Sequence, residues 1–491
     1  MLLLGLDIGT SSIKATVLDA QTQQTIYSTN FPETEREIKS VNHGFAEQDP
    51  NQWWEDVKMV IKKIVASKSC NTKNIAAIGI GYQMHGLVCV DKNNEVLRDS
   101  IIWCDSRAVE IGEKAFESIG QEKCLTHLLN SPGNFTASKL SWVKQNEPEI
   151  YKRIHTILLP GDFIAMKFTG EITTTISALS EGIFWDFKNN QLSDDIIRYF
   201  EFDKKIFPEI QPVFSYHGKI TQAIAEELSL TPGIPVTYKA GDQPNNALSL
   251  NVMKKGEVAA SAGTSGVIYA VEDQLIYDTK SRINSFAHVN YTATNKNIGI
   301  LLCMNGIGIL NRWVKNCIGK ASYESMNYKA SEVEIGSNGL LVYPFGNGAE
   351  RMLGNKSLGG SFQNVDFNIH TQAHIYKATQ EGIAFAFKYG FDILKENKVQ
   401  PSVIRAGKSG MFLSNLFAQT FSDALQVPIE MYNNDGSAGA AIGAGIGLGI
   451  YKNEVVAYNN LKPIQRIEPN LNTGIESVYQ QWLSNLNKQL K

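Results

Sequence analysis

The sequence predicts a mixed α/β protein built from two similar domains that face each other across a central cleft. Apolar strands alternate with amphipathic segments along most of the 491 residues, a pattern typical of sheets covered by helices. A Gly-Thr-Ser motif at residues 9–11 recurs at residues 263–265, half a chain later. An internal repeat over that distance indicates gene duplication. We therefore expect one domain over residues 1–246 and a second over residues 247–491.

The first thirty residues predict three strands of one sheet. Apolar residues 2–6 form the first strand, a turn of small residues follows at 9–12, and β-branched residues mark a second strand at 13–18. Residues 25–31 predict a third strand. The second copy of the motif lies between similar runs, and Asp19 and Asp273 close the second strand of each copy. Each half of the chain therefore begins with the same kind of hairpin.

Helices and strands alternate after each hairpin. Residues 50–67 place Trp53, Val57 and Ile61 on one face, which predicts an amphipathic helix. A helix is expected at 411–425, and the uncharged, glycine-rich run 436–450 predicts a helix that packs very close to its neighbour. Further apolar runs predict strands at residues 75–80, 154–159, 236–240 and 403–406.

Charge and composition narrow the classes of function. Lys and Arg number 46 and Asp and Glu number 49, so the net charge is −3, and no long run of one sign occurs. This pattern gives no indication of a nucleic-acid or membrane partner. The apolar N-terminal run reaches Asp7 with no basic segment before it, unlike a signal peptide. The run 436–450 is shorter than the roughly 20 residues of a membrane span, so we expect a cytoplasmic protein.

The cysteines give no indication of a disulfide framework or a zinc site. Six cysteines are scattered along the chain, and no two of them form a Cys-x-x-Cys pair. We expect all six to be reduced residues of the core.

The turn of the first hairpin resembles a cradle for phosphate oxygens. It offers consecutive backbone N–H groups, the hydroxyl groups of Thr10, Ser11 and Ser12, and the ammonium group of Lys14. The alternative is a tight hairpin whose hydroxyl groups cap their own backbone. The second copy, facing the first, favours the phosphate interpretation.

Two carboxylates follow predicted strands. Asp7 is placed to hold a hydrated Mg²⁺, which uses one or two carboxylates together with substrate phosphates; alternatively, it caps its own turn. Asp242 ends the strand 236–240 and enters what we expect to be a loop crossing between the halves. Phosphoryl transfer to an alcohol needs a base for the hydroxyl proton, and Asp242 fits that role. Its alternative role is a helix N-cap or an Asx-turn.

A Gly-Lys-Ser triplet at residues 407–409 resembles the end of a P-loop and lies between a predicted strand and a predicted helix. A P-loop has glycine five residues before its Gly-Lys pair, whereas this chain has Ser402 there. We therefore exclude a P-loop kinase.

Four segments together resemble the FGGY family of carbohydrate kinases, within the actin-like and hexokinase-like (ribonuclease H-like) ATPase superfamily. They are residues 7–12 and 240–243 as phosphate segments, residues 263–266 at the start of the second domain, and residues 135–142 as a signature of the first. Other elements are similar to members of the family that phosphorylate xylulose: residues 47–50 with Trp53 and Trp54, residues 83–86, Trp103 with Asp105 and Arg107, and residues 158–162.

The resemblance implies an ATP- and Mg²⁺-dependent enzyme that phosphorylates the terminal hydroxyl group of a ketopentose, converting D-xylulose to D-xylulose 5-phosphate. It implies Asp242 as the proton acceptor and Gln83, Met84, His85 and Gln243 as sugar contacts. A neutral imidazole suits vicinal hydroxyl groups because it both donates and accepts hydrogen bonds. For the nucleotide the resemblance implies residues from both halves: Thr10, Ser11, Ser12, Lys14, Gly263, Thr264, Gly308, Arg312, Gly410 and Ser414.

The chain departs from the family pattern at three places. Lys408, Ser409 and Gly410 replace a common triple glycine near the adenine site, Glu350, Arg351, Met352 and Leu353 stand where Glu-Arg-Thr-Pro is usual, and Ala178 replaces a carboxylate. Two alternatives stay open: a kinase of the same family for L-ribulose, L-fuculose, D-gluconate or glycerol, and a non-catalytic actin-like sensor of sugar and nucleotide. The aromatic residues are numerous enough to form the surface of a homodimer.

Overall fold

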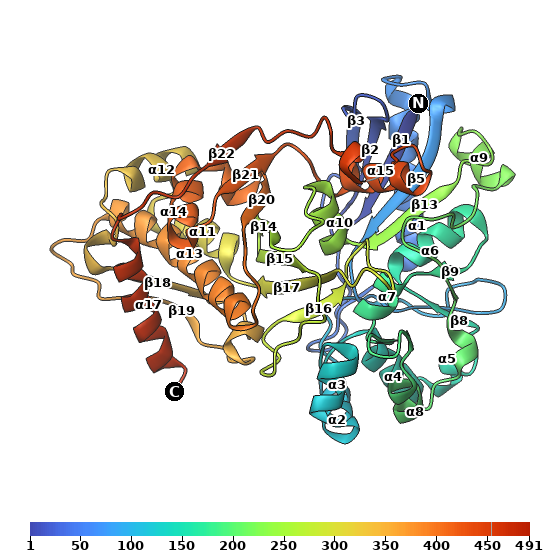
Figure 1. Cartoon of the computed structure of the whole chain (residues 1–491), viewed down its shortest axis with the longest axis horizontal. Helices are drawn as coiled ribbons and strands as arrows, with labels where there is room; N and C mark the ends of the chain where they lie inside the picture. The colour runs from blue at the N-terminus through green and yellow to red at the C-terminus, as the bar shows by residue number, and fades with distance from the viewer. Residues whose placement is uncertain (453) are drawn as a thin grey trace.

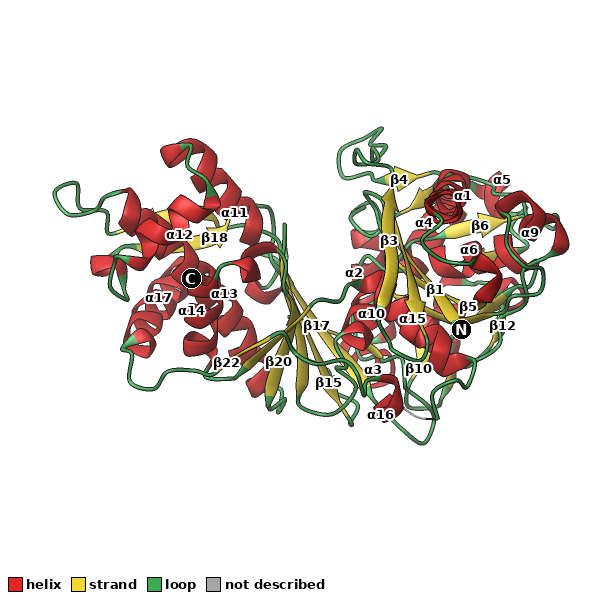
Figure 2. Cartoon of the chain, turned by 90° about the horizontal axis from the view of Figure 1, so that it is seen from above, coloured by secondary structure: helices red, strands yellow, loops and turns green. Residues whose placement is uncertain are grey.

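The computed structural model describes residues 1–452 and 454–491, which form two lobes (Figure 1). Figure 2 shows the lobes from above, each with its own sheet and its own helices. The first lobe is built on a five-stranded sheet with the order β13-β5-β1-β2-β3. Its strands are β1 (Leu2–Ile8), β2 (Ile13–Asp19), β3 (Thr25–Phe31), β5 (Ile75–Tyr82) and β13 (Val236–Gly241).

The second lobe is built on a seven-stranded sheet with the order β16-β17-β15-β14-β20-β21-β22. Its strands are β14 (Glu257–Ala262), β15 (Gly266–Glu272), β16 (Asn284–Ala287), β17 (Ile298–Met304), β20 (Val403–Gly407), β21 (Ile429–Tyr432) and β22 (Gln465–Ile467).

The two sheets share one arrangement of five strands. In the first sheet β3, β2 and β1 are antiparallel neighbours, and β5 and β13 continue in parallel. In the second sheet β17, β15 and β14 are antiparallel neighbours, and β20 and β21 continue in parallel. The duplication predicted from the repeated Gly-Thr-Ser motif is therefore confirmed in the topology, and the two copies of the motif form equivalent turns.

Helices and short strand pairs complete the lobes. The first half of the chain contains α1 (Pro50–Ser67), α2 (Val109–Ile119), α3 (Gln121–Leu128), α4 (Thr136–Asn146), α5 (Pro148–Tyr151), α6 (Pro160–Thr169), α7 (Ile176–Glu181), α8 (Asp194–Phe200), α9 (Gln222–Leu228) and α10 (Asp242–Ser249). The second half contains α11 (Ile307–Val314), α12 (Tyr323–Ser331), α13 (Gln372–Glu396), α14 (Asn415–Leu425), α15 (Gly436–Gly447), α16 (Glu454–Ala457) and α17 (Ile475–Gln489). The short pairs are β4 (Glu47–Gln48) with β7 (Ser100–Ile101), β6 (Val88–Val90) with β8 (Thr156–Leu158), β9 (Thr173–Thr174) with β12 (Glu209–Ile210), β10 (Trp185–Asp186) with β11 (Gln191–Leu192), and β18 (Leu341–Phe345) with β19 (Gly359–Gln363).

Local sequence determines α1 completely. The Asp49 side chain caps the helix by accepting a hydrogen bond from the Asn51 N–H, and Pro50 occupies the first turn, where no intrahelical N–H is needed. The face that the sequence predicts to be apolar is buried against the first sheet, and each large side chain on it contributes about 1.5–3 kcal/mol. The predicted helix over residues 50–67 is thus confirmed.

Three predicted elements differ from the structure. The chain after Asp242 is not a loop, because residues 242–249 form α10, with Gly241 as its N-cap. The predicted helix 411–425 begins later: Gly410–Leu413 form a 3₁₀ turn, and the Ser414 hydroxyl then caps α14 by accepting from the Phe417 N–H. The strand predicted at 154–159 contains only β8.

The glycine-rich helix α15 crosses from the second half of the chain to the first lobe. It packs on β1, β2, β5 and β13, and the orange-red helix lies among the blue strands in Figure 1. A Cβ atom on Gly5 would lie 1.9 Å from the Ser437 carbonyl oxygen, and one on Gly79 would lie 1.9 Å from the Ala440 carbonyl oxygen. The close packing predicted from its small residues is confirmed, and α10 lies beside it between the two sheets.

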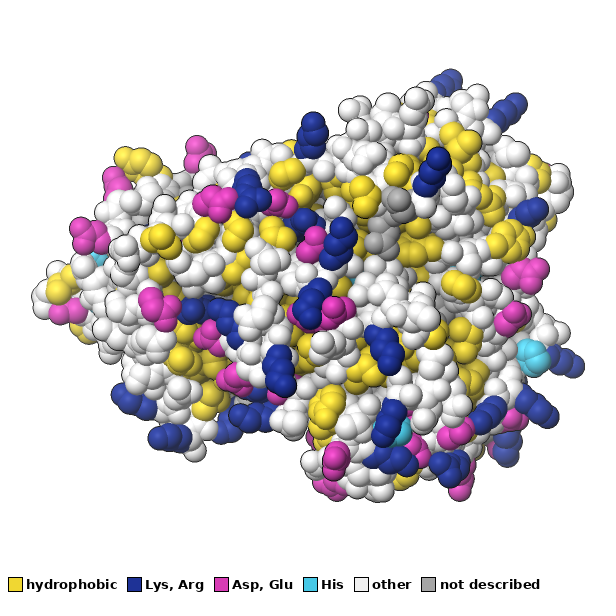
Figure 3. All heavy atoms as spheres, viewed as in Figure 1, with side chains coloured by type: hydrophobic (Ala, Val, Ile, Leu, Met, Phe, Trp, Pro, Cys, Tyr) yellow, Lys and Arg dark blue, Asp and Glu magenta, His cyan; other side chains and the backbone are white. Residues whose placement is uncertain are grey.

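Charges of both signs are interspersed over the face shown in Figure 3. No helix in the described part of the chain is long and apolar enough to cross a membrane. All six cysteines are free, but the expectation that all lie in the core is wrong: Cys89 and Cys124 are buried, Cys70 is half-buried, and Cys104, Cys303 and Cys317 are exposed.

Candidate active site

Side-chain hydrogen bonds hold the first hairpin turn in place. The Thr10 hydroxyl donates to the Gln83 side-chain oxygen (3.1 Å) and accepts from the Trp103 indole N–H (2.9 Å). The Gln48 amide donates to the Thr10 carbonyl (2.8 Å) and accepts from the Gln83 amide (3.1 Å). Gln83, predicted to touch the sugar, is thus buried and engaged with the turn. The predicted phosphate residues Ser11 and Lys14 are exposed, and Ser12 is half-buried.

The two predicted carboxylates come together because β1, β5 and β13 are parallel neighbours. Asp7 lies near the end of β1, and Asp242 follows β13 in the first turn of α10. Burial raises the pKa of Asp7 to about 6, although nearby Lys14 opposes this shift. Burial and the charge of Asp7 raise the pKa of Asp242 to about 7, while hydrogen bonds from Gln243 oppose the rise. A carboxyl group with this pKa exchanges protons readily near neutral pH.

His85 follows β5 and is held as a neutral imidazole. Burial lowers its pKa to about 3. Its Nδ1 lies 2.9 Å from the carbonyl oxygen of Glu181, and because a carbonyl only accepts hydrogen bonds, Nδ1 carries the proton. The other ring nitrogen, Nε2, is therefore an acceptor. Phe135 and Phe286, from opposite lobes, pack on the ring at centroid distances of 4.8 and 5.3 Å.

The backbone at His85 is fixed from behind. Its φ is +62°, and its carbonyl oxygen accepts from the Lys139 ammonium (3.0 Å) and the Thr136 hydroxyl (3.2 Å). Lys139 also donates to the Ile102 carbonyl (2.9 Å), and burial lowers its pKa to about 7. Met84, next to His85, is buried at the same chain turn. The imidazole is thus presented by a rigid loop.

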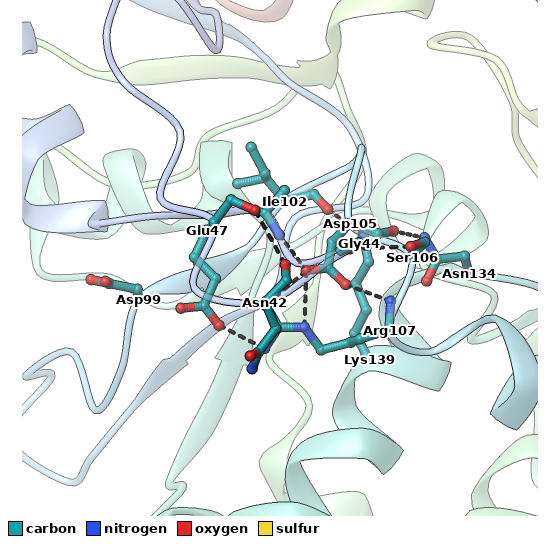
Figure 4. A network of polar contacts seen from close by, with 12 residues as sticks. Asn42, Gly44, Glu47, Asp99, Ile102, Asp105, Ser106, Arg107, Asn134 and Lys139 are labelled. Atoms are coloured by element: carbon teal, nitrogen blue, oxygen red, sulfur yellow. Dashed lines mark hydrogen bonds and ion pairs between the residues drawn. The ribbon is translucent and has the colours of Figure 1, made fainter. Parts of the chain in front are cut away.

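A buried polar network extends from Lys139 and is shown in Figure 4. Asp105 accepts from the Ala46 N–H (2.6 Å) and pairs with Arg107 (2.7 Å). Arg107 also pairs with Glu47 at 2.7 Å. The dashed contacts of the figure link these groups into one cluster. This cluster fixes the segment that contains Trp103. Its residues therefore stabilise the site but are not expected to contact the substrates.

The second lobe contains a cavity of about 450 Å³ that faces the second hairpin turn. Six predicted nucleotide residues, widely separated in sequence, line it together: Gly263, Thr264, Gly308, Arg312, Gly410 and Ser414. The structure thus brings together every nucleotide residue predicted in the second half of the chain. A cavity of this size falls within the range of about 300–1,000 Å³ found for small-molecule sites.

Asp242 also lies near the second lobe. Its charge adds to the raised pKa of Cys303, near the end of β17; the larger cause is desolvation by the surrounding protein, although the residue is exposed at the surface. In the same strand Met304 pairs with Gly266, the residue that begins β15 directly after the second hairpin turn. A carboxyl group from one lobe and a phosphate-type turn from the other are therefore parts of one site.

Family comparisons agree with this two-lobed site. Residues 2–249 match the model of the N-terminal domain of the FGGY family of carbohydrate kinases, and residues 258–448 match the model of its C-terminal domain. The chain belongs to the FGGY family. It is an ATP-dependent carbohydrate kinase, and the predicted family and fold are confirmed.

Relatives and solved structures extend over the full length of this FGGY kinase. A protein of Staphylococcus epidermidis named xylulose kinase is 30% identical over 485 residues, which cover 98% of this chain and 95% of that protein. A crystal structure described as a xyloylose kinase from Brucella ovis has a TM-score of 0.89 at 24% identity, with 99% of both chains covered. A gluconate kinase from Lactobacillus acidophilus has a TM-score of 0.90 at 20% identity, covering 100% of this chain and 98% of that one. The shared fold therefore does not determine the sugar.

The residues that line the cavity of the kinase are of the kinds that a nucleotide needs. A Cβ atom on Gly308 would lie 2.1 Å from the Gly263 carbonyl oxygen, and one on Gly410 would lie 2.4 Å from the Ala262 carbonyl oxygen. These glycines let two segments approach the hairpin backbone closely. The apolar side chains of Met411 and Leu413 line the cavity together with polar groups, as a planar base requires.

The carboxylates of the kinase fit a magnesium ion held largely by water and phosphate. Among the described residues, no group of three or more His, Cys, Asp or Glu side chains could hold a metal ion. Mg²⁺ commonly uses only one or two carboxylates plus substrate phosphates. Asp7 would hold the ion in this manner, and Mg²⁺ would neutralise phosphate charge during transfer.

Three residues of the site escaped sequence reasoning as functional groups. Trp103 is 51% exposed, although its indole N–H bonds Thr10. Lys139 is fully buried behind His85, and Glu181 is buried beside it. Two features of the sequence could have indicated them. Lys139 lies within the family signature 135–142, and Glu181 is a single carboxylate in the otherwise uncharged run 176–185.

Proposed function

We propose that this kinase transfers the γ-phosphoryl group of ATP to the terminal hydroxyl group of a ketopentose, D-xylulose, and forms D-xylulose 5-phosphate and ADP. The position of Asp242 carries the proposal: Gly241, the residue before it, lies against Met84, and the charge of Asp242 acts on Cys303 of β17, the strand that borders the second hairpin. The names of the full-length relatives support the choice of xylulose.

The transfer uses Asp242 as the general base. The terminal hydroxyl group gives its proton to the Asp242 carboxylate, its oxygen forms a bond to the γ-phosphorus, and the bond from that phosphorus to the ADP oxygen breaks. Proton transfer of this kind contributes about 10²–10⁴-fold to a rate. Positioning of the phosphates supplies most of the remaining acceleration. Thr10, Ser11, Ser12 and Lys14 would contact them from the first lobe, and Gly263 and Thr264 from the second.

His85, Met84 and Gln243 would hold the sugar. The free Nε2 of His85 accepts a hydrogen bond from a hydroxyl group, and its low pKa keeps it neutral at physiological pH. Met84 supplies an apolar wall next to the carbon chain. Gln243, next to Asp242, offers an amide that donates and accepts. These groups suit an uncharged polyhydroxylated acceptor.

The proposal is tested by measuring ADP release in a coupled assay with Mg-ATP. The acceptors are D-xylulose, L-ribulose, L-fuculose, D-gluconate and glycerol, and the Asp242→Asn variant is assayed in parallel. We expect the highest kcat/KM for D-xylulose and a fall in kcat of about 10²–10⁴-fold in the variant. A thermal melt of the variant serves as the control for folding.

Other results would redirect the assignment. A higher kcat/KM for another acceptor would retain the kinase and replace the substrate. Full turnover by the Asp242→Asn variant would refute the assignment of Asp242 as the general base. ATP binding without turnover of any acceptor would favour the sensor of sugar and nucleotide. The expected homodimer and the cytoplasmic location stay predictions.

A further inference from the structure

Glu181, the last residue of α7, is a buried carboxyl group with too few hydrogen-bond partners. Its relative exposure is 2%, and in the described part of the chain neither carboxyl oxygen has a partner in good hydrogen-bond geometry; the Tyr82 hydroxyl is the one polar group there close enough to affect its pKa through a hydrogen bond. Glu381 provides a contrast at the same exposure: its oxygens accept from the Gly336 N–H (2.9 Å) and the Ser337 hydroxyl (2.8 Å). A buried polar group left unpaired destabilises a protein by about 1–3 kcal/mol. Such a group in a folded enzyme therefore needs an explanation.

The position of Glu181 connects it to the sugar-binding loop and to the base. A Cβ atom placed on Gly241 would lie 2.7 Å from the Glu181 Oε2 and 2.6 Å from the Met84 Cγ. Gly241 directly precedes Asp242. The carbonyl oxygen of Glu181 also receives the His85 Nδ1–H at 2.9 Å. Glu181 is thus in contact with the loop of Met84 and His85 through its backbone, and its carboxyl group lies against the residue that precedes Asp242.

The surroundings of Glu181 favour its protonated form. Burial raises the pKa of its carboxyl group well above the usual range, and the charges of Asp242 and Asp162 add to this rise. A hydrogen bond from the Tyr82 hydroxyl opposes the rise and is second only to burial, and the ammonium of Lys139 opposes it least. A protonated carboxyl group offers one O–H donor and a carbonyl acceptor. A sugar hydroxyl group needs this combination, since it also donates and accepts.

We propose that the Glu181 carboxyl group hydrogen-bonds a hydroxyl group of the bound sugar and is a substrate-positioning residue of this kinase. The inference rests on the proposed function and assigns to it an additional contact. In this proposal, a hydroxyl group of the bound sugar supplies the hydrogen bond that the Glu181 carboxyl group lacks in the free protein.

Two substitutions separate this role from a structural one. Glu181→Gln keeps the shape and both kinds of hydrogen bond, whereas Glu181→Ala removes them. Calorimetric titration with D-xylulose in the absence of ATP measures sugar affinity directly, and steady-state kinetics give KM for each substrate. Glu381→Gln is the matched control, since it alters another buried carboxyl group far from the sugar loop.

We expect Glu181→Ala to raise both the Kd and the KM for D-xylulose by about tenfold or more, as loss of a buried hydrogen-bonded partner does. The KM for ATP should stay within about twofold. Glu181→Gln should retain the sugar affinity within about threefold, and Glu381→Gln should change neither KM. If Glu181→Ala does not fold, Glu181→Asp is used instead, because it withdraws the carboxyl group by one methylene. This variant should raise the KM for the sugar and leave the KM for ATP unchanged.

The inference is overturned if Glu181→Ala lowers the melting temperature but leaves the Kd and KM for the sugar unchanged. It is equally overturned if Glu181→Gln loses as much sugar affinity as Glu181→Ala. Failure of the proposed substrate is a separate result: if D-xylulose is inactive and another neutral sugar is phosphorylated, the same titrations with that sugar decide the role of Glu181.

Discussion

Three carboxyl groups with raised pKa values lie close together where the first sheet meets the second lobe. Burial is the main cause for Asp7, Asp242 and Glu181, and repulsion involving Asp242 adds to the shifts of Asp242 and Glu181. Without substrates, the site is therefore an acidic pocket that disfavours full ionisation.

The pKa of Asp242 predicts the pH dependence of the kinase. The base must be ionised to accept a proton, and its pKa is about 7. We expect kcat/KM for the sugar to be constant above neutral pH and to fall by about tenfold per pH unit below pH 7. His85 does not contribute in this range, because its pKa is about 3.

The pH profile is measured at saturating Mg-ATP between pH 5.5 and pH 8.5, a range of about three units around the expected transition. The residual activity of Asp242→Asn should lack the transition near pH 7. A transition of equal size in that variant would assign it to another group. A profile that fell toward high pH would contradict a carboxylate base.

The helix α15 shows how glycine controls packing between elements. The sheet and the helix approach so closely that backbone atoms occupy the space of absent side chains at Gly5 and Gly79. The same principle joins α11 to the second hairpin at Gly308. Small residues therefore serve both the core of the first lobe and the wall of the nucleotide cavity.

We expect Gly79→Ala to destabilise the protein, because its Cβ would lie 1.9 Å from the Ala440 carbonyl oxygen. Overpacking of this kind typically lowers the free energy of unfolding by about 1–3 kcal/mol. A change of 1 kcal/mol shifts the melting temperature by about 2–4 °C in large domains. The measurement is a thermal melt. Gly407→Ala is the control, since its Cβ would meet the Asn434 carbonyl oxygen at 3.4 Å and the Ser409 hydroxyl oxygen at 3.7 Å, which are ordinary contacts; equal losses in both variants would refute the packing argument.

Sequence patterns predicted the elements whose determinants are local. Helix α1 and strand β3 have the bounds that their periodicity predicts, since capping and alternation are read within a few residues. Helix α10 was missed because its eight residues include Pro244 and two asparagines, and contacts with both sheets stabilise it. The start of α14 was misplaced because Ser414, inside an apolar run, acts as a cap.

The residues of the candidate site also differ in whether a local sequence pattern predicts them. Motifs predicted Asp7, Asp242 and the residues of the second-lobe cavity, which the structure brings together. The partners of His85 were not predictable, because Lys139 and Glu181 reach it from 54 and 96 residues away along the chain. No short-range pattern records such contacts.

Across the molecule, the proposed sugar site joins the lobes at one end, and the nucleotide cavity lies in the second lobe. Phe286 of the second lobe packs on His85 of the first at 5.3 Å, and the Arg351 guanidinium lies 5.9 Å from the Phe135 ring. Contacts between lobes therefore already surround the residues proposed to bind the sugar. Bound phosphates would add contacts between the two hairpin turns.

We expect the lobes to move closer together when both substrates are bound, because both hairpins would contact the same phosphates. Closure would exclude water, which otherwise competes with the sugar as phosphoryl acceptor. Small-angle X-ray scattering with D-xylulose and a non-hydrolysable ATP analogue should show a smaller radius of gyration than the free protein. The sugar alone is the control. An unchanged radius with both ligands bound would show that the lobes are already closed.

The placement of α15 also affects how the chain is made. A ribosome releases the strands of the first lobe early, but the helix that covers them follows β21 of the second sheet in the sequence. The apolar face of the nascent sheet stays open until translation has passed residue 447. Folding of the first lobe is thus completed only after most strands of the second sheet have been made, and chaperones that shield apolar surfaces can act on it during that interval.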